Sequence, residues 1–271
     1  MGPALIVIAC LAGVPLVLMV IRTAGFAALV RGLEARLEGA TPQDVSARLP
    51  QEVRDFALRS DATPSDIASR VELTQVAELQ QSADDPWRLL EARQTIVTGT
   101  PGFVWEAWRD MGPLPKLRVV DSFVGGKGRL RIQLFGLFVP VDATGPDFDR
   151  GEALRYLAEL PWTPDAILGN AQLRWRMTDT GWAEVSLAVS GRPATLQFRF
   201  KGGDIVEFRA ENRPALNAEG KLELREWRGY FRNYRMIGTR RVPSEGEVGY
   251  VRKGSYRPYF QGRITGYDTV H

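Results

Sequence analysis

The sequence has 271 residues and an ordinary composition, with 44% hydrophobic, 10% aromatic and 25% charged residues. These values exclude a long disordered chain or a coiled coil, and predict one large domain with its own core. The single cysteine, Cys10, and the single histidine, His271, exclude a disulfide within the chain, thiolate metal sites and triads that need histidine. We therefore expect no metal and no cofactor.

The first feature along the chain is an uncharged apolar run from Ala4 to Ile21. At about 1.5 Å per residue it spans about 27 Å, enough to cross the hydrocarbon core of a bilayer. It predicts a transmembrane anchor over residues 1–27, bent near Pro15. A cleaved signal peptide lacks support because no basic residue precedes Arg22. A lipoprotein box ending at Cys10 would have only nine residues before it and no basic region. We therefore do not favour lipidation of Cys10.

A second helix is predicted over residues 28–40, next to the membrane. Leu29, Leu33 and Leu37 recur at a spacing of four, and charged residues lie between them. Three arginines follow the apolar run and none precedes it, which by the positive-inside rule favours a cytoplasmic domain. The remaining chain, residues 41–271, is expected to form a single antiparallel β domain with short helices.

Three Thr-Pro pairs predict short helices, because Thr is a good N-cap and Pro a good first helical residue. They are Thr41-Pro42, Thr63-Pro64 and Thr163-Pro164. Pro50 is expected to divide the first of these helices.

After Arg70 the hydrophobic period changes to two, which indicates strands. Gly125 to Gly128 lies between alternating segments, so we interpret it as a hairpin turn and not a phosphate loop, which would open a helix. A helix is predicted from Asp149 to Leu160, ended by Pro161. Strands are predicted at 71–79, 87–97, 103–108, 117–124, 130–134, 173–177, 183–189, 196–200, 206–210, 222–241, 246–251 and 259–267.

Basic residues are concentrated between Lys221 and Arg263. This range contains eleven basic residues and only four acidic ones. Such a surface suits phospholipid head groups or a nucleic-acid backbone. Arginine alternating with apolar residues is also typical of a half-solvated sheet, and we favour that interpretation and expect no nucleic-acid partner. The candidate surface residues are Arg240, Arg241, Arg252 and Lys253.

Carboxylates are the remaining candidates for chemistry. Asp142, Asp149 and Glu159 allow a carboxylate-dependent hydrolase or a metal-binding enzyme if they meet in one cleft. Asp149 also suits the first turn of a helix, where negative charge is stabilising. A ligand cavity is the other hypothesis, with an acid and tryptophans as its walls. Its candidate residues are Trp105, Glu159, Trp162 and Trp175.

Several segments together resemble an uncharacterised bacterial family, a domain of unknown function that follows an N-terminal membrane segment. They are Leu49-Pro50, Gly102 to Trp105 with Ala107, Leu154 to Trp162, Arg240 to Pro243 and Glu245 to Val248. The resemblance covers most of Leu49 to Tyr267 and implies a fold similar to lipoprotein-carrier (LolA/LolB-like) half-barrels. In such a fold a curved antiparallel sheet carries short helices on its concave face.

The expected function is a membrane-anchored, non-enzymatic domain that holds an apolar or lipid-like ligand in the half-barrel. The enzyme described above is one alternative. A protein-interaction scaffold that uses the basic C-terminal residues is the other. The carrier analogy favours the periplasmic side of a bacterial inner membrane, against the arginine rule, and we expect the domain there.

Overall fold

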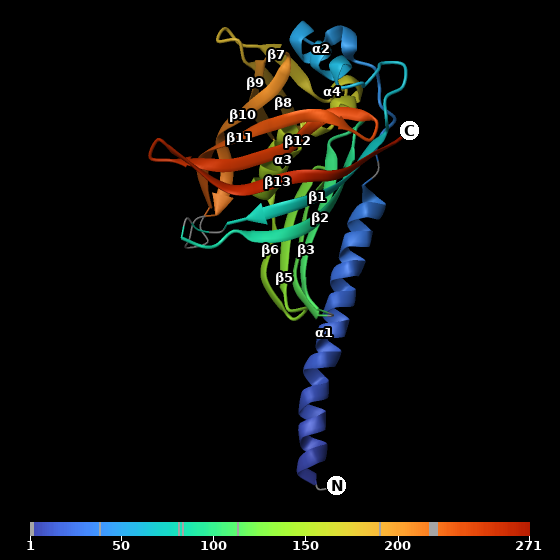
Figure 1. The fold of residues 1–271 in the computed structure, drawn as a ribbon, viewed down its shortest axis with the longest axis vertical. Helices are drawn as coiled ribbons and strands as arrows, with labels where there is room; N and C mark the ends of the chain where they lie inside the picture. Colours follow the sequence, from blue (N-terminus) through green and yellow to red (C-terminus); the bar gives the residue numbers. More distant parts are fainter. Residues whose placement is uncertain are drawn as a thin grey trace.

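The computed structural model describes residues 3–37, 39–80, 82, 84–112, 114–189, 191–216 and 222–271. A long N-terminal helix, α1 (Pro3–Arg36), leads into a body built around one curled sheet (Figure 1). Thirteen strands form this sheet, and every pairing between neighbours is antiparallel. The chain is thus mainly β, a curved half-barrel with short helices, as the sequence predicts.

Two meanders make up the sheet. The first contains β1 (Arg70–Leu79), β2 (Arg88–Val97), β3 (Gly102–Met111), β4 (Leu114–Val124), β5 (Lys127–Leu134) and β6 (Phe138–Thr144). The second contains β7 (Arg174–Met177), β8 (Ala183–Val189), β9 (Arg192–Lys201), β10 (Asp204–Leu216), β11 (Leu222–Ile237), β12 (Arg240–Arg252) and β13 (Ser255–Val270). They join where β1 pairs with β13, and β6 and β7 are the two edges.

The helices between the meanders lie inside the curl of the sheet. These are α3 (Pro146–Ala158), the 3₁₀ turn η2 (Leu160–Trp162) and α4 (Pro164–Gly169). Helix α3 contacts β4 and β5 of the first meander and β8, β9 and β10 of the second. Its burial on the concave face unites both halves in one hydrophobic core. A 3₁₀ turn η1 (Ser46–Arg48) and helix α2 (Gln51–Arg59) pack near α4 at the top of Figure 1.

The alternation of apolar and polar residues sets which face of each strand is buried. In β8, Ala183, Val185 and Leu187 point into the core, as their period of two predicts. In β10 strict alternation from Val206 would bury Val206 and expose Glu207. A bulge between Ile205 and Glu207 shifts the register, so Ile205 and Glu207 are buried and Val206 is only half-buried.

Gly125 and Gly126 form the two-residue turn of the β4–β5 hairpin, with φ of 59° and 76°. Positive φ at both central residues defines the tight hairpin turn that matches strand twist, so this prediction is confirmed. Gly128 meets the start of α3 so closely that a Cβ would lie 2.5 Å from the carbonyl oxygen of Phe148. The hairpin is therefore packed directly against the cavity-facing helix.

Helix α1 is continuous through the region where two helices were expected. Beyond Arg22 its buried residues Phe26, Val30 and Leu33 pack on Val104 of β3 and Val120 of β4. These valines lie on the face of the sheet opposite to α3, since the adjacent Trp105 points to the core. The segment predicted to lie next to the membrane therefore packs on the outer face of the sheet.

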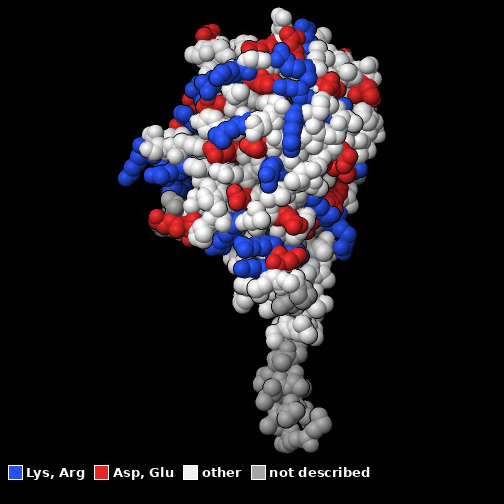
Figure 2. Space-filling model, in the orientation of Figure 1, with Lys and Arg blue, Asp and Glu red and all other residues white. Residues whose placement is uncertain are grey.

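The part of α1 that projects from the body is apolar. Figure 2 shows no charged atoms on its described surface below the body. The helix is long and apolar enough to cross a membrane, by length and composition, over Pro15–Arg36 within the described residues. Its exposed large residues are Leu16, Val17, Leu18, Val20 and Ile21.

Two of the three Thr-Pro pairs do not begin helices. After Thr41-Pro42 the chain is extended, because the Gln43 and Val45 amides donate to the carbonyl groups of Gly169 and Leu168. After Thr63 a turn closes on Asp66 instead. The third pair does begin α4, although the Thr163 hydroxyl donates back to the Glu159 carbonyl and does not cap the helix.

Other helix and strand bounds also shift. Pro50 precedes α2, so it divides η1 from that helix as expected. The strand predicted over 222–241 is broken at Gly238, where φ is 58° and the chain turns from β11 into β12.

Candidate functional site

A cavity of about 330 Å³ lies between α3 and the concave face of the sheet. Its walls come from both meanders and from α3, and most of them are aromatic or aliphatic. The apolar part of the wall is formed by Leu79, Trp105, Val119, Leu130, Ile132, Phe148, Ala158, Trp162, Phe208, Pro214, Ala215, Leu222, Trp227, Phe231, Val248 and Phe260. A concave, largely apolar space with a few polar groups is typical of a small-molecule binding site.

Three of the four predicted cavity residues line this space, namely Trp105, Glu159 and Trp162. The fourth, Trp175, does not line it. It lies on edge strand β7, where its ring stacks on Phe198 at 6.0 Å.

Trp162 is held by contacts on every side. Its indole Nε1 donates to the Pro243 carbonyl at 2.8 Å, and its ring meets Phe231 edge to face at 5.4 Å. Gly246 of β12 lies beneath it, and a Cβ there would be 2.8 Å from the indole. This glycine therefore lets the indole lie directly against the strand.

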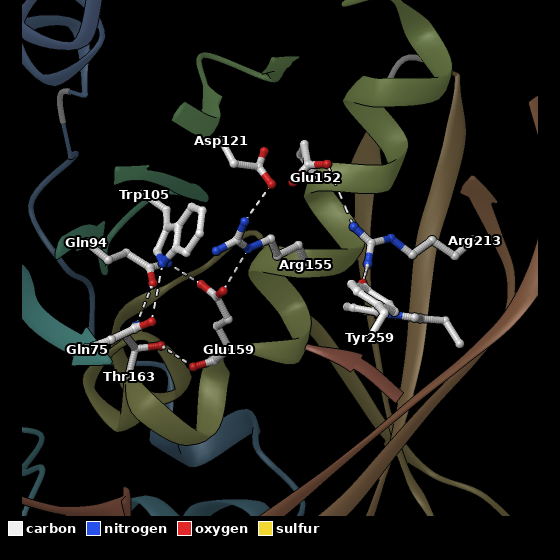
Figure 3. Close-up of polar contacts among 11 residues, drawn as sticks. Gln75, Gln94, Trp105, Asp121, Glu152, Arg155, Glu159, Thr163, Arg213 and Tyr259 are labelled. Atoms are coloured by element: carbon white, nitrogen blue, oxygen red, sulfur yellow. Dashed lines mark hydrogen bonds and ion pairs between the residues drawn. The ribbon is translucent and has the colours of Figure 1, made fainter. Parts of the chain in front are cut away.

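An ionic network crosses the cavity floor around Arg155 of α3 (Figure 3). Its Nη1 donates to Asp121 at 2.5 Å, and its Nε donates to Glu159 at 2.9 Å. The guanidinium also lies 4.9 Å from the ring centroids of Trp105 and Phe103. Burial opposes the charge of Arg155, but Glu159 and Asp121 outweigh it and raise its pKa.

A chain of buried amides extends this network. Gln94 donates to the second oxygen of Glu159, Gln75 donates to Gln94 at 3.1 Å, and Trp105 Nε1 donates to Gln75 at 3.3 Å. Each polar atom in the chain thereby gains a partner, which buried polar groups need.

A second buried arginine, Arg213 of β10, lies on the other side of Glu152. Its Nη1 donates to the Tyr259 hydroxyl at 3.2 Å, and its Nη2 is 3.7 Å from a Glu152 oxygen. Its guanidinium stacks on Trp227 at 3.9 Å, and Trp227 Nε1 donates to the same Tyr259 hydroxyl. Figure 3 shows Arg213 between Glu152 and Tyr259.

Two of the cavity carboxyls are shifted toward their neutral form. Burial raises the pKa of Glu152 well above its ordinary value, and the charge of nearby Asp121 raises it further. Burial also raises the pKa of Glu159, although Arg155 and Gln94 oppose that shift. Glu152 has Asp121 as a close acidic neighbour, and its pKa is raised well above the ordinary value.

Sequence reasoning missed Asp121, Arg155 and Arg213 as site residues. Arg155 lies within the distinctive segment from Leu154 to Trp162, which was the available signal. Asp121 and Arg213 lie on ordinary-looking strands, and only the tertiary fold brings them to α3.

The three carboxylates named for an enzyme do not meet. Asp142 pairs with Arg129 and Arg131 on the sheet and is 37% exposed. Asp149 is buried where it accepts from the Gly128 amide and pairs with Lys127. Only Glu159 of the three lines the cavity. Within the described part of the chain, no group of three His, Cys, Asp or Glu residues is placed to hold a metal.

The four basic candidates do not form one surface. Arg240 is 7% exposed and binds Asp165 through two hydrogen bonds, so its assignment to the surface is wrong. Arg241 binds Asp204 in the same way. Arg252 and Lys253 are exposed at the opposite end of β12. On the face in Figure 2, basic and acidic groups are interspersed.

The fold and cavity define a half-barrel with a partly polar, mainly apolar interior. The chain belongs to the family of unknown function DUF6544, which matches residues 38–262. No curated protein matches the sequence.

Solved structures with related folds show low similarity. A LolA superfamily protein from Nitrosomonas europaea is 7% identical, with a TM-score of 0.40, and the match covers 81% of this chain and 93% of that one. A domain assigned to outer membrane lipoprotein sorting from Vibrio parahaemolyticus is 9% identical, with a TM-score of 0.45 over 83% and 93%. A DUF1329 family protein from Desulfovibrio piger is 9% identical, with a TM-score of 0.43 over 84% and 93%. At these values the neighbours establish no function for this chain.

Proposed function

We propose that this protein is a membrane-anchored, non-enzymatic binding domain whose half-barrel holds an apolar or lipid-like ligand. The observation that carries this proposal is the cavity of about 330 Å³ beneath α3, with its mainly aromatic and aliphatic walls. That volume falls at the lower end of the roughly 300–1,000 Å³ typical of ligand sites. It suits a slender molecule such as a single hydrocarbon chain.

The apolar helix supports the anchoring part of the proposal. Among the residues whose side chains the structure describes, α1 contacts the body from Arg22 onward, and in this proposal the stretch from Ala4 to Ile21 crosses the bilayer. At the end of that stretch, Arg22 donates to the Leu137 carbonyl at 2.7 Å. The β5–β6 turn beside it exposes Phe135 and Phe138, which are 46% and 64% exposed. These aromatic side chains lie where the membrane surface would be.

The side of the membrane is a further part of the proposal. We place the body in the periplasm, anchored to a bacterial inner membrane, because a large domain is translocated largely regardless of a few flanking arginines. An alkaline phosphatase fused after His271 should be active, and a green fluorescent protein at the same position should be dark. The reverse pattern would place the body in the cytoplasm.

Mass spectrometry of lipid extracts from the purified full chain tests the ligand. We expect an amphiphile at near-stoichiometric amount in the wild type and a large loss of it in Ala158→Phe, since Ala158 lines the cavity. The matched control is Ala188→Phe, at an exposed position of β8. Equal lipid in all three proteins, or none in the wild type, would contradict the proposal.

A carboxylate-dependent hydrolase is the second candidate, and one observation favours it. Glu152 and Asp121 lie together in the cavity, and the raised pKa of Glu152 would suit a general acid. If this candidate holds, extracted ester lipids incubated with the full chain should yield free acid, and Asp121→Asn should abolish the product. Unchanged lipids after long incubation would remove it.

A further inference from the structure

Arg213 is a buried cation whose partners do not balance its charge. Its residue exposure is 7%, and one face of its guanidinium stacks on Trp227. By comparison, Arg155 and Arg240 each donate to carboxylate oxygens at 3.0 Å or less. Within the described residues, Arg213 has one hydrogen bond, which it donates to a neutral phenol, and a Glu152 oxygen at 3.7 Å.

One edge of this guanidinium carries a donor that the described residues leave unused. Nη1 is used by Tyr259, while Nε is buried without a hydrogen-bond partner among the described residues. Nε and Nη2 form the side edge of an arginine, which binds two oxygens of a carboxylate or phosphate in parallel. A buried guanidinium donor without a partner is costly, so an anion at this edge is stabilising.

The charge distribution of the cavity also favours an anion at the Nε and Nη2 edge of Arg213. Four acids line the cavity: Asp121 and Glu159 are bound to Arg155, burial shifts Glu152 toward its neutral form, and Asp147 is exposed at the start of α3. Among the described residues, the carboxylate oxygen paired with Arg213 is that of Glu152, which at 3.7 Å lies beyond hydrogen-bond distance. An incoming anion would neutralise Arg213 at little desolvation cost to the remaining pairs.

An apolar path leads away from Arg213. Trp227 contacts Phe208 at 4.6 Å between ring centroids, Phe208 contacts Phe231 at 6.0 Å, and Phe231 contacts Trp162 at 5.4 Å. All four rings line the cavity. A hydrocarbon chain lying along them would keep its head group at Arg213.

We propose that the Nε and Nη2 edge of Arg213 binds the anionic head group of a single-chain amphiphile, a carboxylate or a phosphate monoester. The hydrocarbon chain of the ligand lies along the aromatic path. This inference rests on the proposed function, and it adds the chemical class of the ligand and the residue that selects it.

Native mass spectrometry of the full chain released from micelles tests the selection. Hexadecanoic acid, hexadecyl phosphate and hexadecanol are added at equal concentration, and acetate and inorganic phosphate serve as anions without a chain. We expect one or both anionic amphiphiles to bind about tenfold or more above hexadecanol. Arg213→Gln should remove that preference, and Arg232→Gln, at an exposed position of β11, should keep it.

The outcomes separate the two proposals. If no long-chain probe binds, the proposed function fails. If hexadecanol binds as well as both anionic amphiphiles, only the present inference fails. Binding of acetate or phosphate as tight as that of the amphiphiles would indicate a site for small anions and would also overturn it.

A second variant keeps the test informative if Arg213→Gln does not fold. Glu152→Gln removes the carboxyl nearest to Arg213 and leaves the arginine in place. We expect this variant to keep or increase the preference for anionic amphiphiles. A loss of the preference would mean that Arg213 serves only to pair Glu152, and would overturn the inference.

Discussion

Arg155 is the residue on which two buried carboxylates depend. It reaches Asp121 and Glu159 from the last turn of α3, and its side chain is only 15% exposed. Removing one partner of a buried ion pair leaves an uncompensated charge, which costs about 3–5 kcal/mol. We therefore expect Arg155→Met to lower the free energy of unfolding by about that amount in urea denaturation.

The matched comparison is an exposed ion pair of the same sheet. Asp142 binds Arg129 and Arg131 at the surface, and water screens such pairs. Asp142→Asn should change the free energy of unfolding by less than about 1 kcal/mol. If both variants lost the same free energy of unfolding, the buried ion pairs of Arg155 would stabilise the domain no more than exposed ones.

Glu152 makes the stability of the domain depend on pH. Because its folded pKa is raised, the folded chain holds a proton that the unfolded chain releases, so this contribution is complete below the ordinary glutamate pKa and is lost as pH rises. Glu152→Gln has no such proton to lose. Its Tm should exceed that of the wild type at pH 8, with the difference shrinking toward pH 4.5. A difference that is constant with pH would contradict the raised pKa.

At the scale of single residues, the sequence predicted the aromatic walls of the cavity better than the charged residues inside it. Trp105 and Trp162 stand out because large aromatic residues between strands usually face a core. The partners of Arg155 and Arg213 come from strands far away along the chain, and a single sequence does not show which side chains meet across a sheet. Trp175 was expected in the cavity too, since it alternates with Arg174 and Arg176. Its strand, β7, is an edge strand away from the cavity.

Among the elements, the strands were the most predictable and the short helices the least. Alternation located nearly every strand because most strands have one face on the core. The strand that was not predicted is β6, which has no buried residue. The segments after Thr41 and Thr63 carry good helix-start residues, yet backbone hydrogen bonds to α4 hold the first extended. Local preference was overridden by tertiary contacts.

Helix α1 offers a test of an element that docks on the sheet. Val30 is 1% exposed and packs in the cluster with Val104 and Val120. Val30→Asp should detach the C-terminal half of α1, since a buried carboxylate has no partner there. Hydrogen exchange in that half should become at least about tenfold faster.

Ala28→Asp is the control for this change. It introduces the same charge on an exposed position of the same helix. Exchange that is unaffected by Val30→Asp, or accelerated equally by Ala28→Asp, would show that the docking contributes little.

At the scale of the whole molecule, the helix and the body together predict an orientation. The lower ends of β3, β5 and β6 lie beside α1, while α2 lies at the far end (Figure 1). With Cys10 replaced by serine, an environment-sensitive dye at Phe138→Cys should show a blue-shifted emission in proteoliposomes. The same dye at Asp55→Cys of α2 should show the unshifted emission of a dye in water. Equal emission at both sites would rule out this orientation.

The antiparallel sheet was predictable from strand alternation and turn residues, and the half-barrel from the family resemblance. The order of the strands was not predicted, since the two meanders join where β1 pairs with β13, at opposite ends of the domain sequence. Pairing between distant strands depends on the curvature of the sheet, and no local pattern encodes it.

The pairing of β1 with β13 also determines when folding can finish. Strand β1 is made directly after α1 and the short helices η1 and α2, and its partner β13 follows only after all the other strands. Until β13 is synthesised, β1 presents an open edge that can pair with other chains. Such distant pairing is also slow. The first meander must therefore wait with an unprotected edge until the last strand is made, and during that interval any nearby copy of the chain is a competing partner.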